Sequence, residues 1–474
     1  MDSQPMKYDS LRVVLHYFEA NKRIQLAARI PSIRKCEKTI PLKIDYLSFK
    51  EDSFTINKIK YEVSIHRHYH ATQTKAYLKF YGDCKLDMDK YGHEDINTWK
   101  YLEPGDIVMN PPQLQEPERH EIEMIGVQEE LLARLEPEFV ILSQANQKYL
   151  QENGFQNIDE LRKCMYSPET NFEKARRLSD YFFREASRFL FIEAVIEQTK
   201  YRLQCLYCLR DDTPPPFKTF LQQKLYKNYE SPCTSEIQHG ELVEYNRKLP
   251  DAIRSILKTV FGGRKCSVLV DTFDVNHYYN IRAPTDLKLK VQKLNIRGGS
   301  RTVCNPLQPI IDSSSLPLKE VFVENFDAFT PDFHHDMVKK ADKLIVGKHE
   351  HGIVWLPILL SLENKIVEMK GIGTSLAALE NYIELIRSWV DKGKPVGTTF
   401  IFDLYDEEVA ENVLVQAAEQ HRGAVKGEGC IAIPMKNRNM LQLSYEDNEE
   451  FTLVLKVLPT NTDAAEQLSN LHIG

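Results

Sequence analysis

The sequence predicts a mixed protein of the α+β or α/β class. It would be built from short N-terminal helices, a small β-rich domain, a helical spacer and a repeat-like C-terminal domain of strands and helices. Three observations predict this class. The apolar period changes from about 3.6 to about 2 at Pro41, a helical pattern returns over residues 118–212, and short β-rich runs then alternate with helical ones.

Length, composition and charge limit the class of protein. The 474 residues suffice for about three domains, and a hydrophobic content of 42% can fill packed cores. With 61 basic against 68 acidic residues the net charge is −7, which disfavours nucleic acid as a partner. The first residues do not resemble a secretory signal, the apolar run 354–360 is too short to cross a membrane, and nine scattered cysteines are unlike a disulfide framework. We therefore expect a soluble cytoplasmic or nuclear protein without a membrane partner.

The N-terminal region, residues 1–49, predicts three short helices and a first strand. Asp9 or Ser10 can cap the first helix, Asn21 can cap the second, and Pro31 opens the third. Helices this short are unstable alone, and they carry more apolar side chains than they can bury among themselves. These side chains would either cover the hairpin that follows or contact a partner protein. The residues concerned are Leu11, Val14, Leu15, Phe18, Ile24 and Leu26.

The middle of the chain predicts a hairpin followed by helices. Residues 54–56 and 59–65 alternate as strands around an Asn57-Lys58 turn, and a loop-rich tract over 82–112 completes a domain that spans 50–117. The helical spacer spans 118–212, and Pro137 and Pro168 are expected to break it. A polyproline stretch, 213–216, marks the border to the last domain.

The C-terminal domain, 217–474, predicts a leucine-rich-repeat-like stack of strand-and-helix units. Its β-rich runs are separated by 26, 27, 23, 22 and 34 residues, near the 20 to 29 typical of such repeats. A conventional βαβ sheet would give a similar alternation. Two stronger helices, 375–390 and 407–421, and strands over 430–458 follow. The runs centre near Val268, Leu294, Val321, Leu344, Ile366 and Phe400.

No motif predicts catalysis, a cofactor or a metal site with any strength. His66, His68 and His70 alternate along a predicted strand and would share one face, as zinc ligands can, but a solvated polar edge explains them better. Cys205 and Cys208 lack a second pair and are expected to be buried thiols. The glycines at 262–263 and 371–373 are fragments of phosphate-binding loops, and we interpret both as turns.

Several short motifs together resemble the nematode F-box C family, and the resemblance extends over most of the chain. They include Tyr8-Asp9-Ser10-Leu11, Lys22-Arg23-Ile24, Arg29-Ile30-Pro31-Ser32, Glu37-Lys38-Thr39-Ile40-Pro41-Leu42, Asp87-Met88-Asp89, Pro104-Gly105-Asp106-Ile107, Phe261-Gly262-Gly263-Arg264 and Gly393-Lys394-Pro395-Val396. One departure is that Met6-Lys7 precedes Tyr8, where F-box helices usually begin with a leucine-proline pair.

The resemblance implies an F-box-like start that docks a Skp-type adaptor, followed by a region that holds a target for ubiquitin transfer. The adaptor would contact the six apolar residues of the N-terminal helices named above. We therefore expect a non-enzymatic substrate receptor whose protein target the sequence does not identify. An interaction scaffold without a ubiquitin link is one alternative, and a zinc-dependent hydrolase using the three histidines is another.

Overall fold

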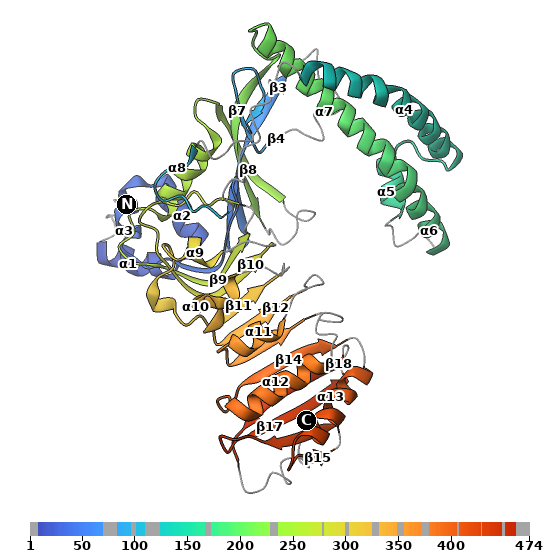
Figure 1. Cartoon of the computed structure of the whole chain (residues 1–474). Coiled ribbons are helices and arrows are strands. Elements are labelled where there is room, and N and C mark those ends of the chain that lie inside the picture. The colour runs from blue at the N-terminus through green and yellow to red at the C-terminus, as the bar shows by residue number, and fades with distance from the viewer. Residues whose placement is uncertain are drawn as a thin grey trace.

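The computed structural model describes residues 8–69, 83–95, 101–109, 124–165, 172–227, 236–276, 279–298, 303–324, 331–347, 355–370, 379–404, 407–427, 429–447 and 451–460. The expected mixed α/β class is confirmed, because one long sheet carries helices along its length and a separate helical arm projects from one end (Figure 1). None of the described helices is both long enough and apolar enough to span a membrane.

The three predicted N-terminal helices are present as α1 (Tyr8–Tyr17), α2 (Ala20–Arg29) and α3 (Pro31–Glu37). Pro31 opens α3 as expected, but the prediction that Asn21 caps α2 is wrong. The Glu19 carboxylate caps α2, because its Oε2 accepts hydrogen bonds from the backbone N–H groups of Asn21 and Lys22. Asn21 is buried instead, and its Nδ2 donates to the carbonyl of Ile56, 3.0 Å away. This contact fixes α2 to the predicted hairpin.

The main sheet contains strands from both ends of the chain. Its order is β15-β16-β17-β18-β14-β13-β12-β11-β10-β9-β1-β2-β3-β7-β8, and β4 (Asp83–Cys84) pairs with β3. The bounds are β1 Lys43–Phe49, β2 Ser53–Ile56, β3 Ile59–Tyr69, β7 Phe217–Lys227, β8 Glu236–Glu244, β9 Val268–Asn276, β10 Leu289–Arg297, β11 Glu320–Val323, β12 Lys343–Val346, β13 Ile366–Met369, β14 Thr399–Leu404, β15 Val425–Gly427, β16 Cys430–Pro434, β17 Met440–Asp447 and β18 Phe451–Leu458. A separate pair consists of β5 (Asp87–Met88) and β6 (Glu94–Asp95).

Strands β9 to β14 form the expected stack. Each pairs in parallel with the next along the chain, and each of the six predicted strand centres falls in one of them. Alternate residues of β11 to β14 are buried, and they align across the strands into continuous apolar rows. One row runs Leu294, Val321, Leu344, Val367, Phe400.

Helices between these strands bury the rows against one face of the sheet, as Figure 1 shows for α11 and α12. The other residues of β11 to β14 are only half-buried. The stack therefore has one covered and one open face. The helices between the strands of the stack are α9 Cys304–Leu307, α10 Asp336–Lys339, α11 Trp355–Ser361 and α12 Leu379–Lys392, with 3₁₀ turns at Ser313–Ser315 and Pro331–His334; α8 (Leu249–Phe261) precedes β9 and α13 (Glu407–Gln420) follows β14.

The helical spacer is an arm inserted between two adjacent strands. Helix α4 (Met124–Glu152) runs out, α5 (Ile158–Met165) and α6 (Phe172–Tyr181) turn the chain, and α7 (Ser187–Arg210) returns after a π-helical turn, Phe182–Ala186. Strand β3, before the arm, pairs with β7, after it. The sheet thus runs through three of the four expected units, 1–49, 50–117 and 217–474, and does not stop at the polyproline border.

Pro137 does not break the arm, contrary to the prediction. It lies inside the continuous helix α4, which packs antiparallel on α7. Phe139 stacks on Phe189 with ring centroids 5.2 Å apart, and Glu136 pairs with Lys200 at 2.9 Å. These contacts on either side of the proline hold the helix together despite the missing backbone hydrogen bond. Pro168 lies outside the described residues.

The loop over 101–109 fastens the first strands to the stack. Gly105 has φ +103°, and a Cβ there would lie 2.7 Å from the carbonyl oxygen of Ala283, so only glycine fits this close approach. Asp106 beside it pairs with Arg254 and Arg282, each at 2.9 Å.

Candidate functional site

The N-terminal helices divide their apolar residues between two cores. Leu15 packs with Cys36 and Ile40 in a small cluster that joins α1 to α3. Ile24 belongs to the main core of the sheet. The three helices are therefore not a loose extension but are docked on the body of the protein.

The six residues expected to contact an adaptor consequently lie in different surroundings. Leu15 and Ile24 are buried, with exposed fractions of 1% and 9%, and are enclosed by this chain. Phe18, just after α1, is 39% exposed. The remaining three, Leu11, Val14 and Leu26, are half-buried.

A more exposed set of apolar side chains on α1 was missed from the sequence. Val13 is 58% and Tyr17 is 82% exposed, and the two are neighbours on the helix surface because they are four residues apart. With Phe18 they form what we call the α1 face. The sequence signal was present in this i, i+4 spacing, but it lies beside the stripe of Leu11 and Leu15 that the apolar periodicity emphasised.

A buried cluster of charges ties α2 and α3 to the end of α8. Glu37 pairs with Arg23 and with Arg264, each at 3.0 Å, and all three side chains are at most 5% exposed. Arg23 also donates to the carbonyls of Pro41 and Ile40. Burial lowers the pKa of both arginines, which the neighbouring Glu37 carboxylate partly offsets.

Lys38 strengthens the same junction. Its Nζ donates to the carbonyls of Thr259 and Val260, at 2.6 and 2.7 Å, where the last turn of α8 leaves carbonyls without helical partners. Burial, and then the nearby Arg264, lower the pKa of Lys38 to about 8. Three separate motifs of the sequence are thus brought together, one with Arg23, one with Glu37 and Lys38, and one with Arg264.

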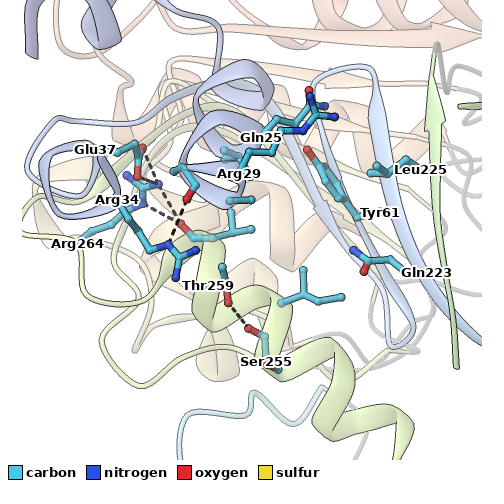
Figure 2. A pocket seen from close by; sticks show the side chains of 15 residues that line it. Gln25, Arg29, Arg34, Glu37, Tyr61, Gln223, Leu225, Ser255, Thr259 and Arg264 are labelled. Carbon is cyan, nitrogen blue, oxygen red and sulfur yellow. Dashed lines mark hydrogen bonds and ion pairs between the residues drawn. The ribbon is translucent and has the colours of Figure 1, made fainter. Parts of the chain in front are cut away.

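A pocket of about 520 Å³ opens beside this cluster, between α2, α3, β3, β7 and α8 (Figure 2). Its apolar wall includes Ile24, Ala27, Tyr61 and Val260, which are buried, and Leu225 and Ile256, which are half-buried. Its charged lining is unbalanced. Arg29, Arg34 and Arg264 line it, and the only acidic residue among the fifteen in Figure 2 is Glu37, which is already paired.

The open face of the stack is a second candidate surface. Phe322, Ile345 and Ile401 project there from β11, β12 and β14 and are half-buried. They share this face with charged residues, among which Lys343 and Glu368 pair at 2.7 Å. Such a mixed, accessible surface on a rigid sheet could contact a macromolecule.

The histidines expected as possible zinc ligands are only partly described. His66 is half-buried and His68 is exposed on β3, while His70 lies outside the described residues. In the part of the chain with assigned positions, no group of three or more His, Cys, Asp or Glu side chains could hold a metal ion.

The two weaker motifs are also placed only in part. Cys205 and Cys208 are buried on α7, as predicted, and burial raises the pKa of Cys205 to about 12. Gly263 follows α8 with φ +70°, typical of a turn. The glycines at 371 and 373 lie outside the described residues.

Residues 248–406 match a family described as a domain of unknown function (DUF3557). The match covers about a third of the chain and extends from α8 through β14, so it includes the whole parallel stack and the Arg264 side of the pocket. No curated protein and no solved structure matches the chain significantly. The expected presence of a domain of unknown function is confirmed for this region.

Proposed function

We propose that the chain is a non-enzymatic substrate receptor similar to the F-box C proteins. Its N-terminal helices would bind a Skp-type adaptor, and its C-terminal stack would hold a target protein for ubiquitin transfer in the cytoplasm or nucleus. The observation that carries this proposal is the α1 face, which stays exposed although the helices that bear it are firmly docked.

The docking of α1 to α3 supports the adaptor half of the proposal. A receptor has to transmit a fixed geometry from adaptor to target, and a face on a loosely attached helix could not do so. Leu15, Ile24 and the Arg23–Glu37–Arg264 cluster provide that attachment. Val13, Tyr17 and Phe18 remain available, and large apolar side chains of this kind contribute most to protein interfaces.

The open face of the stack supports the target half. Parallel strands in chain order create an extended, rigid surface, and repeat architectures commonly bind proteins on such surfaces. Half-buried apolar residues interleaved with charges allow both contact area and specificity.

Co-purification with a Skp-type adaptor tests the proposal. Val13→Asp with Tyr17→Asp places two charges on the α1 face without touching a buried side chain, so folding should be unchanged. Leu15→Asp is a poorer test because it would disrupt the cluster with Cys36 and Ile40. We expect wild type to retain adaptor and the double variant to recover at least about tenfold less.

The matched control is Val415→Asp on α13, which changes a valine of comparable exposure (48%, against 58% for Val13) far from α1 in the fold. It should recover as much adaptor as wild type. If wild type recovers none, or the double variant recovers an equal amount, the adaptor role is wrong. A stable partner bound to the C-terminal half in the absence of adaptor would instead favour the scaffold without a ubiquitin link.

A further inference from the structure

We infer that the pocket in Figure 2 binds a small organic phosphate. The phosphate group would contact the arginines of the lining, and the apolar or aromatic body would pack against Tyr61, Ile24 and Leu225. This site goes beyond the proposed function and does not depend on it. The inference rests on the volume of the pocket, its unbalanced charge and an unsatisfied donor on a buried arginine.

The volume and the walls suit a small molecule. About 520 Å³ lies within the roughly 300–1,000 Å³ usual for ligand sites, which combine apolar walls with a few polar groups. Here the apolar wall is contributed by α2, β3, β7 and α8, and the charged groups lie on α2, α3 and the segment after α8. The site is therefore assembled from four parts of the chain, as Figure 2 shows.

The charge of the lining selects an anion. Arg29 and Arg34 line the pocket and are exposed. Arg264 also lines it, and its side chain is almost completely buried. Glu37 cannot balance the three, because Arg23 and Arg264 already share it. Guanidinium groups bind phosphate with paired, charge-assisted hydrogen bonds, so an arginine excess in a part-enclosed pocket favours a phosphate group.

Arg264 supplies the independent observation. Its Nη2 donates to Glu37 and its Nε to the carbonyl of Val260. Its Nη1 is buried and, among the residues that the structure describes, has no hydrogen-bond acceptor. A buried donor without an acceptor is costly and uncommon in a folded protein. Because Nη1 itself presents almost no accessible surface, a phosphate oxygen would satisfy it once the Arg264 side chain, which lines the pocket, turns this donor toward it.

Isothermal titration of the full chain with phenyl phosphate tests the inference, with phenol and inorganic phosphate as comparison ligands. We expect saturable binding of one phenyl phosphate per chain. Phenol lacks the phosphate group and inorganic phosphate lacks the aromatic ring, so each should bind at least about tenfold more weakly than phenyl phosphate. Arg29→Gln with Arg34→Gln should weaken phenyl phosphate binding at least about tenfold.

The matched control is Arg12→Gln, which removes an exposed arginine on α1 outside the pocket lining and should leave affinity unchanged. Arg29 and Arg34 are both exposed, and the replacement removes one hydrogen bond, from Arg34 Nε to the carbonyl of Ala27, so the chain should still fold, which the melting temperature without ligand verifies. The inference is overturned if phenyl phosphate does not bind saturably, if phenol or inorganic phosphate binds as tightly, or if the double variant keeps the affinity of wild type.

Discussion

Glu37 shows how one residue can determine the attachment of the N-terminal helices. Its carboxylate is shared by Arg23 of α2 and Arg264 of the segment after α8, and each of the three side chains is at most 5% exposed. The sequence showed these residues only as parts of separate motifs. The pair of Glu37 and Arg264 joins positions 227 residues apart, and no local pattern reports a contact over that separation.

Replacing Glu37 by Gln should destabilise the protein strongly. The change leaves two buried guanidinium groups without a counter-charge, and breaking a buried pair in this way costs about 3–5 kcal/mol. Urea denaturation gives the free energy of unfolding. The matched control is Glu384→Gln, which breaks the exposed pair with Arg387 and should cost less than about 1 kcal/mol. Equal costs for the two variants would contradict the role given to the buried cluster.

His421, at the end of α13, should make stability depend on pH. Burial, and then the positive charge of Arg387, lower its pKa, while Asp391 opposes the shift. The unfolded chain therefore binds a proton more readily than the folded one, and stability is lost as the pH falls below the usual pKa of about 6.5. The free energy of unfolding should decrease more between about pH 7.5 and pH 5.5 in wild type than in His421→Gln. Identical slopes would show that His421 makes no such contribution.

At the scale of elements, the arm has a core of its own. Leu150, Leu161, Leu178, Phe182 and Ala186 pack together near its tip, separate from the core of the sheet. Sequence patterns predicted the helices but not their return path, because a helix that folds back and one that continues have the same periodicity. The pairing of β3 with β7 is what makes the helices an insertion.

Leu161→Ala should therefore loosen the arm and leave the sheet intact. Leu161 is fully buried, and removing such a side chain costs about 2–5 kcal/mol. Hydrogen exchange read by mass spectrometry should show faster exchange in α5, α6 and the ends of α4 and α7, with β9 to β14 unchanged. Val367→Ala, a fully buried residue of β13, should give the reverse pattern. Faster exchange everywhere in both variants would mean that arm and sheet unfold as one unit.

At the scale of the whole molecule, the stack was the most predictable part and the continuity of the sheet the least. Val321, Leu344 and Phe400 were identified as strand centres because each strand alternates buried and half-buried residues, which periodicity detects directly. The parallel pairing of β1 with β9 joins residues more than two hundred positions apart. No spacing in the sequence encodes that pairing.

The candidate sites were predictable to a lesser degree, for the same reason. The apolar content of the N-terminal helices was evident, yet which side chains face solvent depends on the contacts that α1 makes with α3. Leu15 and Ile24 became part of the interior, while Val13 and Tyr17 stayed outside. The pocket depends on four distant segments and had no signature in any one of them.

The account depends most on the α1 face being the surface that binds an adaptor. Hydrogen exchange of the full chain, measured with and without a purified Skp-type adaptor, tests this directly. We expect the adaptor to slow exchange over residues 8–18 and to leave β10 to β14 unchanged. No protection anywhere, or protection confined to the stack, would contradict the account.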